Sequence, residues 1–343
     1  MECITIKDVA RVCGVGVSTV SRAINNHPDI NPETKEMIMQ VIKENNYVPN
    51  NSARNLKRSD ARAIAILIKG ISNPFFNSMI KFFEEEIQKK KYSLVLQHVD
   101  AWQDETEVAL ELEKEKRLRG IIFLGGIASH SQEQLKKIPV PFVLSTVSLL
   151  GKEYKNDYSF VSVDDVKESC RMTEHLISQG HEKIVLLCSY KEDVSIGALR
   201  LTGYKKALEA HNIPVDERRI RHMDPELDSY SMESGYRMTK ALLEEGVDCT
   251  AIFAISDSLA IGAVRALIDA GKRVPMDISV AGFDGTEMAA YYNPSITTIR
   301  QPAETMARET IKLLFDSIKK KTNVQQLIFE GELVPGESVK KIN

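Results

Sequence analysis

From Ala63 onward, short apolar runs alternate along the chain with longer segments of helical periodicity. The expected strands are residues 63–68, 93–98, 120–124, 141–144, 160–163, 183–188, 251–255 and 278–283, and the segments 296–300 and 326–329 follow them. The expected helices are residues 75–90, 104–116, 131–137, 165–179, 199–211, 231–245, 257–270 and 303–318. Alternating strands and helices predict right-handed βαβ units built on parallel sheets. The pattern runs twice, on either side of a loop at 151–158, and two such units usually enclose a ligand cleft at the carboxyl ends of their strands.

The N-terminal 49 residues show helical periodicity alone. Thr5, with Asp8 three residues later, is a typical start of a helix, and Gly14 and Gly16 end it. A second helix begins at Val17, and a third spans about 31–45. Apolar residues recur at helical spacing: Ile6, Val9, Ala10 and Cys13 in the first helix, Val20, Ala23 and Ile24 in the second. Two short helices joined by a tight glycine turn predict a helix-turn-helix, although an ordinary helical hairpin has the same pattern.

Residues 50–62 are polar and basic, and Leu56 is their one large apolar side chain. A helix of about two turns here is unstable alone in water. The segment is therefore either a solvated linker or a hinge helix that folds on DNA. In the second case Leu56 is placed to act as a wedge in the minor groove.

Composition limits the possible functions. The 343 residues are 43% hydrophobic with a net charge of −3, so sizeable cores are expected and any nucleic-acid surface is local. Five cysteines without a CxxC pair predict neither a disulfide framework nor a zinc site. No signal peptide or membrane-length apolar run occurs, so we expect a cytoplasmic protein. No GxSxG, HExxH or phosphate-binding loop argues for an enzyme, and we expect no cofactor or metal.

Seven segments in order resemble the lactose-repressor (LacI/GalR) family of bacterial transcription regulators. TIKDVARVCGVGVSTVSRAIN resembles the family's headpiece, and YVPNNSARNL its hinge. The others are GHEKIVLL, LRLTGYKKAL, SDSLAIGAVRAL, ISVAGFDGTEMA and TTIRQP. The resemblance covers essentially the full length, and the motifs are specific only together.

The resemblance implies an all-α helix-turn-helix headpiece joined to an α/β core like a periplasmic sugar-binding protein. The headpiece is expected at 1–49, the hinge helix or linker at 50–61 and the core at 62–343. Within the core, one subdomain is expected at 62–161 and 291–322, and the other at 162–290 and 323–343. The family also implies a homodimer on palindromic double-stranded operator DNA, without contact to a membrane.

For DNA, the match points to Val17, Ser18 and Arg22 as base-reading positions. Arg22 suits bidentate contact with guanine in the major groove. The residues expected at phosphates are Thr5, Thr19, Ser21, Asn25 and Thr34. Tyr47 and Asn50 are expected beside the hinge, and Ala53 and Leu56 at the minor groove. The alternative for the base-reading set is a solvent-facing helix surface.

For the effector, Arg200 and Asp284 match family residues that bind ligand, and they are expected to face each other across the cleft. Tyr230 aligns with an aromatic residue that stacks on ligand. The rest of the expected set is Asn73, Phe75, Phe76, Ser256, Asp257 and Gln301. The alternatives are an Arg–Asp salt bridge between the subdomains and phenylalanines buried in the core. Val194 and Ile196 stand where polar ligand contacts are frequent, which indicates a less polar site.

These observations predict a DNA-binding regulator, most simply a repressor, whose operator affinity is controlled by a small effector. A polyhydroxylated effector, a sugar, fits the expected set of residues. A global carbon-control regulator with a phosphorylated protein corepressor is the alternative within regulation. A solute-binding transport protein is the alternative from another class, and the absent signal peptide argues against it.

Overall fold

The computed structural model describes residues 5–24, 27–45, 62–100, 103–126, 132–147, 158–224, 226–227, 230–320 and 324–342. The chain forms two compact units, Met1–Ala61 and Arg62–Asn343. The predicted hinge at 50–61 lies outside the described residues.

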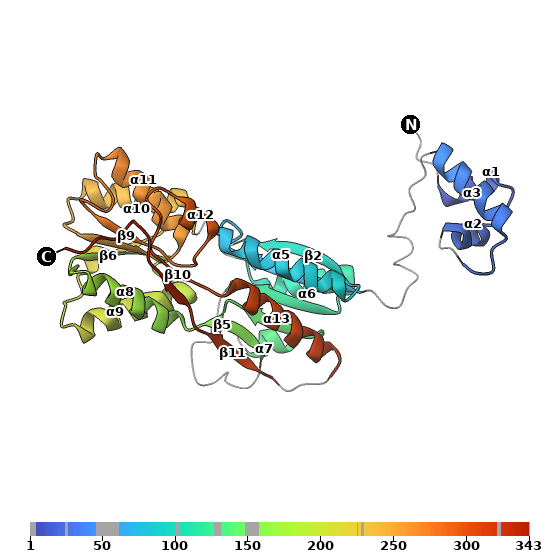
Figure 1. Ribbon diagram of the computed structural model, residues 1–343. Coiled ribbons are helices and arrows are strands. Elements are labelled where there is room, and N and C mark those ends of the chain that lie inside the picture. Colours follow the sequence, from blue (N-terminus) through green and yellow to red (C-terminus); the bar gives the residue numbers. More distant parts are fainter. Residues whose placement is uncertain are drawn as a thin grey trace. The chain divides into compact units, whose positions relative to one another are not determined.

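The described residues of the first unit form three short helices, as the periodicity predicts (Figure 1). They are α1 (Ile6–Val12), α2 (Val17–Ile24) and α3 (Pro32–Glu44). Asp8 accepts a hydrogen bond from the Thr5 amide at 2.9 Å, and Asn31 caps α3 by accepting one from the Glu33 amide at 2.8 Å. Gly14 follows α1 with a φ of +65°, a conformation that glycine adopts without strain. The buried side chains of this unit are Val9, Ala10, Val20, Ala23 and Ile38.

The second unit begins with a six-stranded parallel sheet in the order β11-β5-β4-β3-β1-β2. Its strands are β1 (Ala63–Lys69), β2 (Ser93–Val99), β3 (Gly120–Leu124), β4 (Phe142–Ser145), β5 (Phe160–Val163) and β11 (Gln326–Phe329). Its helices are α5 (Pro74–Lys89), α6 (Glu105–Lys116), α7 (Gln132–Lys136) and α13 (Ala303–Ile318). Alternate residues of β1 enter two separate apolar clusters: one contains side chains of α5 and α13, which lie side by side, and the other those of α6 and α7. This sheet and its helices are the first lobe.

The second lobe has a four-stranded parallel sheet in the order β7-β6-β8-β9. Its strands are β6 (Ile184–Cys188), β7 (Ile220–His222), β8 (Ala251–Ala254) and β9 (Ser279–Ala281). Its helices are α8 (Asp165–Ser178), α9 (Ile196–Ala210), the 3-10 turn η2 (Glu217–Arg219), α10 (Met232–Glu244), α11 (Asp257–Asp269) and α12 (Glu287–Tyr291). Among the described helices, none has both the length and the apolar character needed to cross a membrane.

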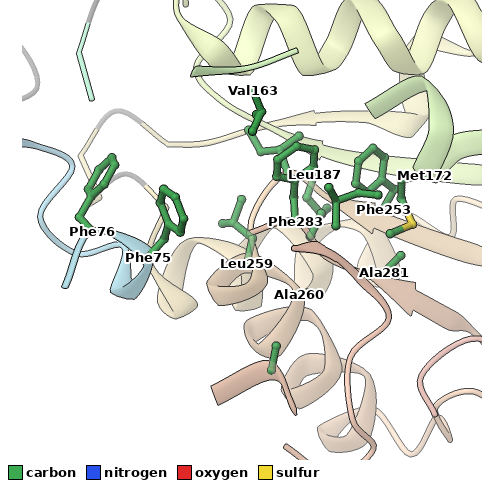
Figure 2. Packing of buried hydrophobic residues seen from close by; sticks show 14 of the residues in the cluster. Phe75, Phe76, Val163, Met172, Leu187, Phe253, Leu259, Ala260, Ala281 and Phe283 are labelled. Carbon is green, nitrogen blue, oxygen red and sulfur yellow. The ribbon is translucent and has the colours of Figure 1, made fainter. Parts of the chain in front are cut away.

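The lobes share one apolar cluster that runs from β1 and α5 to the sheet of the second lobe. Figure 2 shows Val163 at the end of β5 beside Leu187, Phe253 and Phe283 of the second lobe. A further two-stranded antiparallel sheet pairs β10 (Thr298–Arg300) with β12 (Glu332–Val334), and β10 also bridges to residues 281–284. Several chain segments therefore cross between the lobes.

The expected subdomain boundaries need a correction at the C-terminal crossing. Residues 323–343 were expected in the second subdomain, but β11 pairs in parallel with β5, residue by residue from Gln326 opposite Phe160, and so belongs to the first sheet. Pairing between residues so far apart in sequence leaves no local signal. The elements β7, η2, α12 and β12 were not predicted because each is too short to show a periodicity.

Candidate functional site

The exposed face of α2 carries the expected base-reading residues. Val17, Ser18 and Arg22 are exposed, while Val20 and Ala23 on the opposite side are fully buried. Of the expected phosphate contacts, Thr5 and Ser21 are exposed, and Thr19 and Thr34 are half-buried. Five further expected residues lie outside the described part of the chain: Asn25, Tyr47, Asn50, Ala53 and Leu56. One face of α2 is therefore buried in the core of the unit, and the opposite face is exposed to solvent.

A cavity of about 210 Å³ lies between the lobes of the second unit. The first lobe supplies the last residue of β1, residues that follow β1 and β3, and the start of α5. The second lobe supplies the loop between β6 and α9, and Tyr230, two residues before α10 begins. The lining residues are Lys69, Gly70, Asn73, Phe76, Gly125, Gly126, Ser189, Tyr190, Glu192, Asp193, Val194, Ser195, Ile196 and Tyr230. The cavity thus lies at the carboxyl ends of strands from both sheets.

Three of the expected effector residues line this cavity: Asn73, Phe76 and Tyr230. Phe75 does not line it. Both rings belong to the apolar cluster, where Phe75 is 4% and Phe76 5% exposed. Both phenylalanines are therefore core residues, and only Phe76 also borders the cavity, because adjacent helix residues point about 100° apart. Figure 2 shows the two rings on diverging sides of the start of α5.

Ser256 and Asp257 do not line the cavity and are engaged in local structure. The Ser256 hydroxyl caps α11 by accepting from the Leu259 amide at 3.3 Å. Asp257 accepts hydrogen bonds from the Thr286 amide and the Thr298 hydroxyl, both at 2.6 Å. Burial and the nearby carboxylate of Asp284 raise the pKa of Asp257 to about 7, against the effect of these hydrogen bonds. These two residues hold the loop after β9 to the start of α11.

Asp284 is the centre of a buried polar network behind the cavity wall. Its Oδ2 accepts from the Asn73 amide group at 2.9 Å, and its Oδ1 accepts from the Gln301 amide group at 2.8 Å. Arg200 approaches Oδ1 to 3.6 Å. Burial raises the pKa of Asp284 to about 6, and Arg200 and the two amides oppose this shift. Because Asn73 begins α5 of the first lobe and Asp284 follows β9 of the second, their hydrogen bond joins the lobes.

The expectation that Arg200 and Asp284 face each other across the cleft is wrong. Arg200 lies on α9 and Asp284 follows β9, so both belong to the second lobe. The Arg200 Nε donates to Asp165 at 2.8 Å, and its guanidinium lies 3.6 Å from the centre of the Phe283 ring. Arg200 is 1% exposed and holds two carboxylates of its own lobe in place. The contact between the lobes is made by Asn73.

Sequence reasoning did not select Lys69, Ser189, Tyr190, Glu192 or Asp193. Lys69 ends β1, and its ammonium donates to the Gln103 carbonyl at 2.9 Å and lies 3.5 Å from the Glu105 carboxylate. A position at the carboxyl end of a strand is the signal that identifies Lys69 in hindsight. The other four belong to the loop after β6, where the sequence departs from the family's pattern. No three His, Cys, Asp or Glu side chains of the described residues come together as a metal site requires.

Comparisons with known proteins give a consistent result. Residues 5–50 match the family of bacterial regulatory proteins called the lacI family, and residues 173–339 match the periplasmic binding protein-like domain. The HTH-type transcriptional regulator MalR of Clostridium butyricum is 42% identical over 339 residues, which cover 97% of this chain and 98% of that protein.

Two solved structures extend the comparison. The transcriptional regulator CelR in complex with cellobiose has a TM-score of 0.71 and 29% identity, covering 98% of this chain and 99% of the other. The lac repressor dimer bound to operator and the anti-inducer ONPF has a TM-score of 0.73 and 25% identity, covering 99% and 100%.

Proposed function

Because the chain belongs to the lacI family of bacterial regulatory proteins and is a DNA-binding transcriptional regulator, we propose that a sugar bound between its two lobes controls its affinity for operator DNA. The observation that carries this proposal is the cavity whose wall is built from both lobes. A ligand that touches both walls binds the closed arrangement better than an open one. Such a ligand shifts the population toward closure by its difference in affinity for the two arrangements.

A sugar is favoured as the effector by the lining and by a relative. The cavity combines aromatic rings, Phe76, Tyr190 and Tyr230, with a few polar side chains, which suits the apolar face and the hydroxyls of a pyranose. The structure of CelR, which spans nearly the whole chain, holds cellobiose. The protein acts by binding, without catalysis, in the cytoplasm where bacterial operator DNA lies.

On DNA, α2 supplies the reading surface. A second helix of a helix-turn-helix inserts into the major groove, where Arg22 donates to guanine and Val17 contacts a thymine methyl. The lac repressor, similar over the full length, binds its operator as a dimer. Two headpieces of a homodimer place two copies of α2 on the half-sites of a palindrome.

The test uses the full-length protein and a duplex selected by it from random sequences. Fluorescence anisotropy measures operator affinity with and without cellobiose, maltose and their monosaccharide. We expect one sugar to change the operator affinity by about tenfold or more, the usual scale of allosteric coupling. An inducer lowers the affinity and a corepressor raises it. If no sugar changes it, and only a phosphorylated protein does, the regulator uses a protein corepressor and the proposal is overturned.

A further inference from the structure

We propose that Asp193 and Tyr230 recognise the effector's hydroxyl groups and that the effector is an uncharged saccharide, not a sugar phosphate. This inference rests on the function proposed above and identifies the polar contacts and the ligand class of that site. It adds Asp193 to the residues that the family resemblance selects and gives a role to the hydroxyl of Tyr230, which that resemblance includes.

Two buried polar atoms at the cavity make no hydrogen bond within the described residues. They are Oδ2 of Asp193 and the hydroxyl oxygen of Tyr230, and both residues line the cavity. A buried polar atom without a partner is costly, and such atoms are rare in folded proteins. Burial raises the pKa of Tyr230 well above its ordinary value, with the nearby carboxylate of Asp193 adding to the effect. Tyr230 therefore stays protonated, and its hydroxyl both donates and accepts.

The position of the Asp193 carboxylate is set by the backbone around it. Its Oδ1 accepts from the Ser195 amide at 2.8 Å, just before α9 begins at Ile196. Gly197 leaves room for the carboxylate, because a Cβ there would lie 2.4 Å from Oδ2 of Asp193 and 2.1 Å from the Ser189 hydroxyl. The positive end of the helix dipole also favours an anion at this place. One oxygen is thus fixed, and the other is left to a ligand that donates a proton.

The side chains of Arg200 and Asp284 make hydrogen bonds to other residues of the protein. Arg200 donates to Asp165 and to the Ile255 carbonyl, and Asp284 accepts from Asn73 and Gln301. Neither residue lines the cavity. Within this structure both side chains are turned to protein partners and not to the cavity. Asp284 joins the lobes through Asn73, and Arg200 orders the carboxylates of its own lobe. The lining side chains whose buried polar atoms lack a partner among the described residues are Asp193 and Tyr230.

The charges at the cavity disfavour an anionic ligand. Its lining has one cation, Lys69, and two acidic side chains, Glu192 and Asp193. Lys69 is engaged with the Gln103 carbonyl and the Glu105 carboxylate, so its charge is already balanced by a buried acid. A phosphate would meet Asp193 with no cation of the lining left to pair with it. Hydroxyl groups, in contrast, donate to Asp193 without bringing charge.

The experiment measures sugar binding to the full-length protein by calorimetry. The probes are cellobiose and maltose, each compared with its 6′-phosphate. For the wild type we expect a neutral disaccharide to bind about tenfold or more tightly than its phosphate. Asp193→Asn keeps the size of the side chain and its acceptor for Ser195. This variant should lower the affinity for the neutral sugar by about tenfold, the scale of one hydrogen bond to a charged group. The ratio between the affinities for the neutral sugar and for its 6′-phosphate should also become smaller than in the wild type.

Tyr230→Phe should lower the affinity as well, and the double variant should lose less than the sum of the two because both contact one ligand. Asp248→Asn is the matched control, since Asp248 is exposed on the same lobe and pairs with Lys183 at the surface. It should leave both affinities unchanged.

Each outcome separates the inference from the proposed function. If a neutral sugar binds and Asp193→Asn binds it as tightly as wild type does, the assignment of Asp193 is overturned while the sugar-controlled function stands. If the phosphates bind more tightly, the uncharged ligand class is overturned. If no sugar binds the wild type at millimolar concentration, the proposed function itself fails, and this inference fails with it.

Discussion

Asp284→Asn tests the hydrogen bond between the lobes with the smallest change of shape. In the wild type both carboxylate oxygens accept, one from Asn73 at 2.9 Å and one from Gln301 at 2.8 Å. An asparagine has one acceptor oxygen and one amino group, so one of the two amides would face a donor in place of an acceptor. Arg200 keeps its partner Asp165 at 2.8 Å and therefore stays paired. The substitution therefore mainly weakens the hydrogen bond between Asn73 and residue 284, which joins the lobes.

The expected magnitude follows from that single contact. A buried hydrogen bond to a charged group contributes about 1.5–3 kcal/mol. Because the Asn73–Asp284 bond joins the two lobes, opening them would break it, so the substitution should weaken closure by that amount. Since effector binding requires closure, its affinity should fall by about tenfold to a hundredfold. The affinity of the effector-free protein for operator should change by less.

The assay is calorimetry with a sugar that binds the wild type, done at pH 7.5 where Asp284 is largely ionised given its pKa of about 6. Asn73→Ala removes the same bond from the other lobe, and Asp248→Asn serves as an exposed control. The two substitutions of the bonded pair should be strongly non-additive. Unchanged effector affinity in Asp284→Asn, or losses that simply add in the double variant, would refute the role given to this bond.

Three further predictions concern other parts of the chain. Arg22→Ala should cost about 1–3 kcal/mol on the selected operator and little on random duplex, both measured by anisotropy; equal losses on the two would make Arg22 a phosphate contact. Leu56→Ala should reduce operator affinity and DNA bending, measured by gel mobility of permuted duplexes, with effector binding unaffected; normal bending would exclude the wedge. Burial lowers the pKa of His181, whose ring nitrogens lie 3.0 Å from the Thr250 hydroxyl and the Lys340 carbonyl. The unfolded chain then takes up the proton at higher pH than the folded protein does, so the free energy of unfolding should fall as pH drops below about 6.5. Urea unfolding should show this fall more steeply in the wild type than in His181→Gln, and parallel pH profiles would contradict it.

Much of the fold was predictable because the signals are local. The strand Gly120–Leu124 is an apolar run bounded by Arg119 and by Gly125, and it was predicted with its observed limits. Asn31 followed by Pro32 identified the start of α3 because a cap and a fixed φ act within one turn. The repetition of the strand–helix pattern on either side of 151–158 predicted two α/β units, and the family resemblance then supplied the boundaries of the subdomains.

The site was less predictable because it depends on contacts between distant segments. The expected subdomain at 162–290 already contained Arg200 and Asp284, but the partners of their buried side chains come from distant segments that no local pattern reveals. Asp193 was overlooked because its direction depends on the turn before α9 and on the space above Gly197. Phe75 and Phe76 differ only in the direction of their side chains, which required the placement of α5.

The central claim is that the effector and the operator are linked through closure of the lobes, and reciprocity tests this most directly. Calorimetry measures the affinity of the effector sugar for free full-length protein and for protein saturated with its operator duplex. Linkage requires the ratio of these two sugar affinities to equal the ratio of operator affinities with and without the sugar. We predict equal ratios of about tenfold or more in the wild type, both reduced in Asp284→Asn. A sugar that binds with the same affinity in the presence and absence of operator would contradict the account.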